Sequence, residues 1–266
     1  MDIVYKYRDW NNSFHKNSLL YNEIYLSSPK DFNDPFDCRI TPNFKHLTKE
    51  EKNNYINELA ISQFEDTINE GLDFNFLFNR LIERAKNEDD FQEFLNNINF
   101  ESQDKQYGIF CTSLRWDSLL MWSHYANCHK GFCIGYDQDK LLNSNYFGKA
   151  DLVKYDSKYP SLKPRVAKKD LELIERGFIV THTKSKEWDD EKEYRFFKLF
   201  QNEPYPFERL INLPDEFIVE IVLGINISES GSDEIIRICK EKKIKVYKAI
   251  KKEFEFNIDR IPFTIY

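Results

Sequence analysis

The chain has 266 residues, of which 41% are hydrophobic and 16% aromatic, so it can bury a sizeable core and is not a disordered protein. Its net charge of -7 gives no overall attraction to nucleic acid or to membranes. Only eight glycines are present, which argues against a long glycine-rich phosphate loop. No apolar run approaches the roughly 18 residues of a membrane span, and the opening residues form no apolar leader. We therefore expect a cytoplasmic protein without membrane attachment, whose five cysteines are reduced.

The N-terminal part is predicted to form strands. IVYKYR (3–8) and EIYLSSP (23–29) are rich in β-branched and aromatic residues. The polar segment that follows contains FNDPFD (32–37), where Asn33 and Asp34 precede Pro35 and favour a turn. We expect Phe32 and Phe36 to bury one end of this turn, and the turn to border a cleft.

The periodicity then changes to that of helices. Residues 48–99 place Leu, Ile and Phe among Glu, Lys and Asn at helical spacings, with no proline. Two or three amphipathic helices are expected here, as a helical insertion over residues 45–100.

The rest of the chain alternates strands with shorter helices. The predicted strands are 107–114, 131–137, 150–155, 193–199, 217–224 and 244–250, and the predicted helices are 118–126, 171–185 and 232–243. This pattern predicts one α+β domain over residues 1–266, with a mixed or antiparallel sheet at its core and the helical segment inserted early.

The segment WSHYANCHKGFCIGYD (122–137) brings four potential zinc ligands together: His124, Cys128, His129 and Cys133. A zinc site needs four ligands in a tetrahedron. His129 directly follows Cys128, however, and Cys133 lies in an apolar predicted strand, where cysteine usually acts as a small hydrophobe. We expect no metal site here, but a turn in which Gly131 allows a positive φ.

Several polar residues lie on or at the ends of predicted strands. Glu191 and Glu193, read as positions i and i+2 of one strand, would share a face, where they could perform acid–base work or lie on a solvated edge. Arg8 could grip a phosphate or form a structural ion pair. Thr112 and Ser113 could donate to a ligand or cap the next helix.

Long stretches of the sequence resemble a bacterial family catalogued as domain of unknown function 2971. The matching stretches are YKYR (5–8), LSSPKDFNDPFDC (26–38), FCTSLRWDSLLMWSHYANCHKGFCIGYD (110–137) and EWDDEKEYRFF (187–197). The name of this family carries no activity.

A second resemblance does carry chemistry. Mono-ADP-ribosyltransferases of the Arg–Ser–Glu type have an Arg that ends a first strand, then a Ser-Thr-Ser-like strand, then a Glu-x-Glu strand. This chain is similar in Arg8, in Cys111-Thr112-Ser113 and in Glu191-Lys192-Glu193, although Cys111 replaces the first Ser. The resemblance implies an ADP-ribosyltransferase-like fold and a site that uses NAD as its substrate, without a metal.

The same resemblance implies a role for each matching residue. Arg8 and Thr112 would bind NAD, Arg8 through the phosphates. Ser113 would position the ribose and the glutamate, Glu193 would stabilise the oxocarbenium ion as nicotinamide leaves, and Glu191 would steer the acceptor. Trp122 and Tyr125 could stack on a ring of NAD or pack in the core, and His124 would lie beside them.

The acceptor stays open between a protein, a nucleic acid, a small molecule and water. A toxin with a neutralising partner protein, or a phage-defence effector, would suit such an enzyme. Two other functions compete with the transferase: a metal-dependent nuclease with Asp34, Asp37, Glu191 and Glu193 around Mg²⁺, and a non-catalytic ligand-sensing or interaction module. Salt bridges from the carboxylates of EKEYR (191–195) to Arg8, Arg195 or lysines, together with the lack of a cleft, would favour the last.

Overall fold

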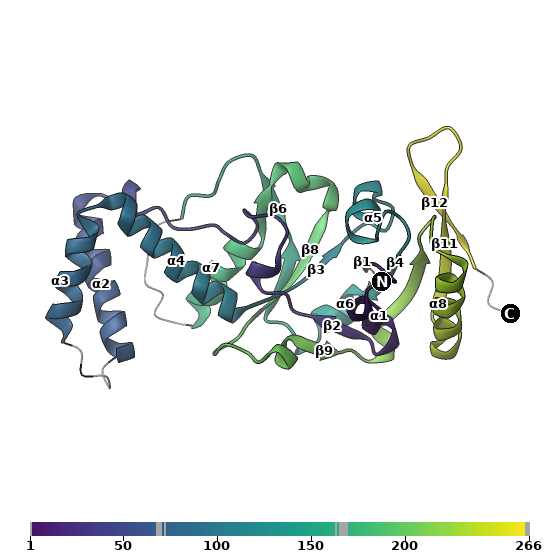
Figure 1. Ribbon diagram of the computed structural model, residues 1–266, viewed down its shortest axis with the longest axis horizontal. Helices are drawn as coiled ribbons and strands as arrows, with labels where there is room; N and C mark the ends of the chain where they lie inside the picture. Colours follow the sequence, from purple (N-terminus) through teal and green to yellow (C-terminus); the bar gives the residue numbers. More distant parts are fainter. Residues whose placement is uncertain (1, 68–70, 72, 163, 165–169, 264–266) are drawn as a thin grey trace.

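A large mixed sheet forms the centre of the molecule (Figure 1). The computed structural model describes residues 2–67, 71, 73–162, 164 and 170–263. In the order in which they lie across the sheet, the strands are β12 (Ile258–Pro262), β11 (Lys245–Lys251), β10 (Ile218–Leu223), β4 (Phe132–Asp137), β1 (Ile3–Arg8), β3 (Tyr107–Ser113), β8 (Glu193–Leu199) and β5 (Lys149–Leu152). Within this sheet β10 and β11 are parallel and the other neighbours are antiparallel. The predicted α+β class with a mixed sheet is confirmed.

Two short strand pairs flank the large sheet. β2 (Glu23–Tyr25) pairs with β9 (Leu210–Asn212), and β6 (Lys154–Asp156) pairs in parallel with β7 (Thr183–Ser185). The strand predicted over residues 150–155 is therefore two strands in different sheets, since Val153 interrupts it and donates its N–H to the carbonyl of Glu193.

Helices cover the sheet and extend from one end of it (Figure 1). They are α1 (Ser13–Leu20), α2 (Lys49–Thr67), α3 (Phe74–Ala85), α4 (Glu88–Gln106), α5 (Leu119–Tyr125), α6 (Gln138–Leu142), α7 (Asp170–Thr181) and α8 (Glu229–Lys242). Local capping fixes several of their starts: the side chains of Asp73, Asn87 and Ser118 accept hydrogen bonds from the first turns of α3, α4 and α5. α7 ends at Thr181, before the predicted end of its helix at 185, because residues 183–185 pair with β6 instead.

Residues 48–99, predicted to contain two or three helices, hold α2, α3 and most of α4. We call these three helices the arm, because they project from the end of the sheet opposite α8 (Figure 1). The arm has its own apolar cluster, centred on Phe44, Leu59, Leu81 and Phe91. Separate clusters pack on the two faces of the sheet. Side chains along β1 point alternately to the two faces of the sheet, so Val4 belongs to one cluster while Tyr5 and Tyr7 belong to the other.

Candidate functional site

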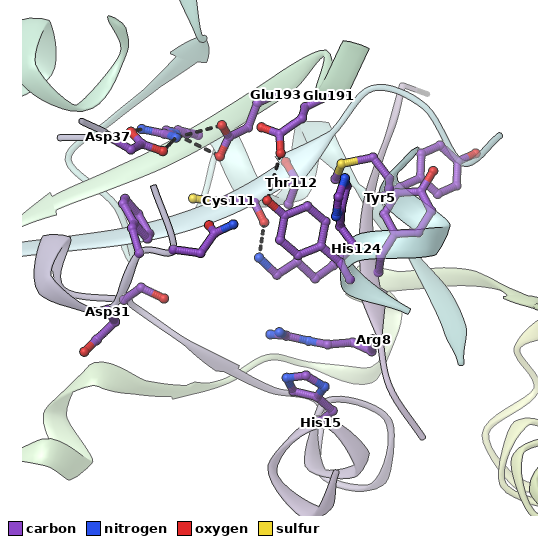
Figure 2. Close-up of a pocket in the computed structure, with 18 of the residues that line it drawn as sticks. Tyr5, Arg8, His15, Asp31, Asp37, Cys111, Thr112, His124, Glu191 and Glu193 are labelled. Atoms are coloured by element: carbon purple, nitrogen blue, oxygen red, sulfur yellow. Dashed lines mark hydrogen bonds and ion pairs between the residues drawn. The ribbon is translucent and has the colours of Figure 1, made fainter. Parts of the chain in front are cut away.

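A cavity of about 570 Å³ opens where β1 and β3 separate (Figure 2). β1 pairs with β4 along its whole length, but with β3 only where Tyr5 lies opposite Ser113. Beyond that point a side chain replaces the ladder: Lys6 Nζ donates to the carbonyl of Cys111 at 2.6 Å. The divergence of two central strands therefore places a polar cavity within the sheet rather than at its edge.

Six separate parts of the chain contribute side chains to this cavity. The lining residues are Tyr5, Lys6, Tyr7, Arg8, Asp9, His15, Ser27, Asp31, Phe32, Asn33, Asp37, Cys111, Thr112, Met121, His124, Tyr125, Asn127, Lys184, Glu191, Glu193 and Arg195. Figure 2 shows Asp37, Glu193 and Glu191 along one side of the cavity, and Arg8 with His15 on the other.

Arg195 organises the carboxylate side. Its side chain has no exposed surface, and its guanidinium donates to both oxygens of Asp37 at 2.9 and 2.6 Å and to both oxygens of Glu193 at 2.8 and 2.7 Å. Burial alone would lower the pKa of Arg195, but the two carboxylates outweigh it and raise that pKa. Burial would likewise raise the pKa of Glu193, and Arg195 with Lys184 instead holds it well below its usual range.

Lys184 joins the third carboxylate to this network. Its Nζ lies 2.6 Å from Glu191 Oε2, 3.3 Å from Glu193 Oε2 and 3.2 Å from Asp37 Oδ2. Burial would lower the pKa of Lys184, but Glu193 and Asp37 raise it above its usual value. Tyr125 donates its hydroxyl to the other oxygen of Glu191 at 2.8 Å. Three carboxylates thus face two cations, so this side of the cavity has an excess of negative charge.

The opposite side has unpaired positive charge. Lys6 and Arg8 are at positions i and i+2 of β1, and within the described residues no carboxylate oxygen lies within 4 Å of their nitrogens. The Nε of Arg8 is buried without a hydrogen-bond acceptor. Burial lowers the pKa of Arg8, which marks the cost of keeping a cation there without a partner.

Most of the residues predicted for the site meet in this cavity. Arg8, Thr112, His124, Tyr125, Glu191 and Glu193 all line it. Thr112 Oγ1 donates to the carbonyl of Tyr194 at 2.7 Å, so its hydroxyl proton is already used within the sheet. His124 is exposed, with its ring against Trp188.

Ser113 and Trp122 do not line the cavity. Ser113 is fully buried, and its hydroxyl donates to the carbonyl of Glu191 at 2.6 Å, so it positions the backbone that carries this glutamate. Trp122 is a core residue: its ring packs edge-on against Tyr7 at 5.2 Å and its Nε1 donates to the carbonyl of Trp116. The expectation that Trp122 borders a ligand is therefore corrected, because α5 turns this side chain into the apolar cluster.

The two glutamates do not share one strand, contrary to the prediction. Glu191 ends the 3-10 helix η4 (Lys186–Glu191), Lys192 has a left-handed conformation with φ 44°, and Glu193 begins β8. The two carboxylates converge because both bind Lys184, rather than because of strand alternation.

The turn at FNDPFD borders the cavity through Phe32, Asn33 and Asp37. Asp34 Oδ1 accepts from the N–H of Phe36 at 2.9 Å, a local bond that holds the turn. The expectation that Phe36 is buried is wrong: its side chain is 71% exposed, because the turn directs it away from the protein.

The turn after α5 is built differently from the prediction. Asn127, Cys128 and His129 all have positive φ (48°, 53° and 66°), whereas Gly131 does not. Glycine is required at 131 because a Cβ there would lie 2.0 Å from the carbonyl oxygen of Arg8. The five cysteines are free, and across the described parts of the chain no three His, Cys, Asp or Glu side chains are grouped so that they could hold a metal.

The arrangement of the carboxylates also bears on the alternative of a metal-dependent nuclease. Asp37, Glu191 and Glu193 converge, but Lys184 and Arg195 already bind carboxylate oxygens of all three, which Mg²⁺ would need as ligands. Asp34 does not line the cavity. The geometry therefore disfavours a metal-dependent reaction at these four residues.

The charged or polar residues of the site that were not predicted from the sequence include Lys6, His15 and Lys184. For Lys6 a signal was present, because it precedes Arg8 by two residues on a predicted strand and so had to share its face. Arg195 was considered as a salt-bridge partner of the carboxylates, and it does pair with Glu193, but its pairing with Asp37 had no signal because the two residues are 158 positions apart.

Comparison with known families gives one match. Residues 121–196, from α5 to β8, match the model of the family described as Protein of unknown function (DUF2971), which supports the predicted resemblance to that family. No curated protein and no solved structure matches the chain. No helix in the part of the chain that the structure describes has both the length and the apolar character to cross a membrane.

Proposed function

We propose that this protein binds NAD in the cavity between β1 and β3 and breaks the bond between nicotinamide and ribose, as an ADP-ribosyltransferase-like enzyme. The arrangement of three neighbouring strands supports this proposal, since Arg8 on β1, Thr112 on β3 and Glu193 on β8 all line the same cavity. These are the residues that the sequence resemblance selects, in the same chain order.

The observation that carries the proposal is the polarity of the cavity. One side presents Lys6 and Arg8 without carboxylate partners, and the other presents a carboxylate cluster with one more negative than positive group. NAD has the matching polarity: its diphosphate is anionic, and its ribose becomes positive as nicotinamide departs. A preformed negative field near that ribose would stabilise the transition state.

Glu191 is the better candidate for the group that faces the ribose. Glu193 accepts from Nε and Nη2 of Arg195 and from Lys184 Nζ, which uses most of its capacity to accept hydrogen bonds. Glu191 accepts one bond from Tyr125 and one from Lys184, so each oxygen has a lone pair left. We therefore assign the contact with the ribose to Glu191, and to Glu193 the role of holding Lys184 and Arg195.

The test is nicotinamide release from NAD, with and without bacterial lysate as a source of acceptors. Glu191→Gln keeps the shape of the side chain and removes its charge, so release should fall by about 10²–10³-fold. Glu187→Gln, in the same 3-10 helix but exposed, should leave the rate unchanged. Wild-type rates for a folded Glu191→Gln protein, or no release by the wild type in either condition, would contradict the proposal.

One observation favours a second function, a non-catalytic module that binds a nucleotide and leaves it intact. Both cations of the cluster are saturated by carboxylates, which is an arrangement that also serves rigidity alone. Such a module would bind NAD or ADP-ribose by calorimetry and release no nicotinamide. The same two measurements therefore separate the two functions.

A further inference from the structure

The loop that joins β11 to β12, residues 252–257, carries two phenylalanines in water. Phe254 and Phe256 are 104% and 102% exposed, more than any other large apolar side chain that the structure describes. Phe254 also has a positive φ of 60°, a strained conformation for an aromatic residue. Figure 1 shows this loop projecting beyond the sheet. The two rings add no buried apolar area to the fold, so they contribute little to its stability.

Phe256 forms one wall of a groove whose other wall is α5. The groove has a volume of about 280 Å³, and its apolar residues are Leu119, Leu120 and Phe256. Both leucines are exposed at the start of α5, more than 130 positions before the loop in sequence. The fold thus gathers apolar side chains from two distant segments around one hollow. A patch of this kind is typical of the centre of a protein–protein interface, whereas single exposed apolar residues are common everywhere.

The charges around the groove favour a basic partner. The groove and the loop together have four carboxylates and two cations, which are Asp117, Asp190, Glu253 and Glu255 against Arg115 and Lys252. Arg115 pairs with Asp117 at 2.9 Å, and the loop lysine pairs with Glu255 at 3.8 Å. Among the described residues, Asp190 and Glu253 have no cation within 4 Å. Even with Lys251, which ends β11, the carboxylates remain in excess, so Lys or Arg side chains would complement this surface.

We propose that the groove between α5 and the β11–β12 loop binds a segment of a partner protein in which apolar anchors are flanked by Lys or Arg. An apolar side chain of the partner would fill the hollow between Leu120 and Phe256, and its basic side chains would pair with Asp190 and Glu253. Nucleic acid and anionic lipid fit less well, because their negative charges would meet the same carboxylates. The inference goes beyond the proposed function and holds whether or not NAD is cleaved.

The groove also lies next to the cavity between β1 and β3. α5 supplies Leu119 and Leu120 to the groove and Tyr125 to the cavity, and the adjacent residues Asp190 and Glu191 are divided in the same way. A partner segment in the groove would therefore lie beside the cavity, with α5 between the two.

The test uses random 12-residue peptides displayed on phage as the probe. They are selected on the wild-type full-length chain and depleted on the double variant Leu120→Ser, Phe256→Ser. We expect the selected peptides to share apolar anchors next to Lys or Arg. The affinity of a synthetic peptide with the selected sequence, measured by fluorescence anisotropy, should fall at least about tenfold with either single substitution. Asp190→Asn and Glu253→Gln should lower it a few fold and weaken its dependence on salt.

The matched control is Phe207→Ser, which removes another exposed phenylalanine, in the 3-10 helix before β9. It should leave peptide affinity unchanged. Because Leu120, Phe256 and Phe207 are all exposed, each variant should melt at the wild-type temperature.

Several results would overturn the proposal. They are a selection that yields no shared sequence, acidic peptides in place of basic ones, and peptides that bind the double variant as tightly as wild type. Dimerisation of the wild type that Phe256→Ser abolishes, seen by sedimentation velocity, would assign the groove to a second copy of the chain instead. Binding to vesicles of phosphatidylcholine and phosphatidylserine that Phe254→Ser abolishes would assign the loop to a lipid surface. Nicotinamide release from NAD bears on none of these outcomes, so failure of the proposed function stays distinguishable from failure of this one.

Discussion

At the scale of single residues, the cavity places Lys6 where its charge is unfavourable. The residue is partly buried beside Arg8, and its lowered pKa means that the protonated amine is less stable there than in water. Functional sites often keep such groups at the expense of stability, because a ligand needs them.

We predict that Lys6→Met stabilises the ligand-free protein at pH 7. Methionine fits a similar volume and removes the buried charge, so the free energy of unfolding should rise by about 1–2 kcal/mol. Urea denaturation measures it, with Lys130→Met as the control, since Lys130 lies on an exposed turn. A Lys6→Met protein less stable than wild type would show that the amine is a structural contact.

A second prediction concerns His182, which lies beneath the carboxylate cluster. Its Nε2 is 3.1 Å from the carbonyl oxygen of Arg195, its ring stacks on Phe178, and burial lowers its pKa to about 4. As the pH falls below about 6.5, His182 takes up a proton in the unfolded chain but stays neutral in the folded chain. Stability should therefore be full above pH 6.5 and fall as the pH drops toward about 4.

A variant shows how much of the pH dependence of the unfolding free energy is due to His182. Between pH 6.5 and 5, His182→Gln should remove up to about 1.4 kcal/mol per pH unit of the wild-type decline in unfolding free energy. Denaturation curves at four pH values in that window measure it. Identical slopes for wild type and variant would show that folding does not lower the pKa of His182.

At the scale of elements, the sequence predicted what local pattern determines. β1 and β8 begin and end at the predicted residues, because each is a short run of aromatic and β-branched side chains between polar turns. The elements that it missed include α1, α6, β7, β9 and β12. α1 is weakly amphipathic and polar at its start, and the short β9 exists only because it pairs with β2, nearly 190 residues earlier.

The residues of the site also divide into those that local sequence pattern predicts and those that it does not. Arg8 and Glu193 could be placed because each marks an end of a predicted strand. The network of Asp37, Lys184 and Arg195 could not, because it depends on three distant segments that only the folded sheet brings together.

The approach of two elements at Gly131 gives a testable consequence. A Cβ at this position would collide with the carbonyl oxygen of Arg8, which is backbone and cannot rotate away. Gly131→Ala should cost about 1–3 kcal/mol of stability and weaken ADP-ribose binding, since the end of β1 must shift and carry Arg8 with it. Gly148→Ala is the control, because its nearest neighbour would be 3.7 Å away. Equal stability of both variants would place the strain elsewhere.

At the scale of the whole molecule, one buried arginine connects the arm to the sheet. Arg209 donates to the carbonyls of Asp104 and Lys105 at the end of α4, to that of Tyr107 at the start of β3, and to that of Leu26 after β2. It thus satisfies carbonyls that a helix end leaves without partners. The apolar cluster of the arm is otherwise its own.

Arg209→Met should therefore loosen the arm before the sheet. We expect amide hydrogen exchange to accelerate in the last turns of α4, while β10 and β11 keep their protection. The loss of these charged bonds should lower the unfolding free energy by about 2–4 kcal/mol. Lys105→Met, which removes an amine paired with the exposed Glu101, is the control. Uniform acceleration across the sheet would show that arm and sheet unfold as one unit.

The alternation along β1 also bears on how faithfully the chain folds. Tyr5 and Tyr7 pack in the cluster of Trp122 and Val222, while Lys6 and Arg8 take the opposite face. A slip of one residue in the pairing of β1 with β4 would bring both cations into that apolar cluster. The two charges thus raise the free energy of the misregistered sheet, and so favour the correct register during folding. By this logic the Lys6→Met protein, although more stable once folded, should yield more aggregate when it is refolded from urea.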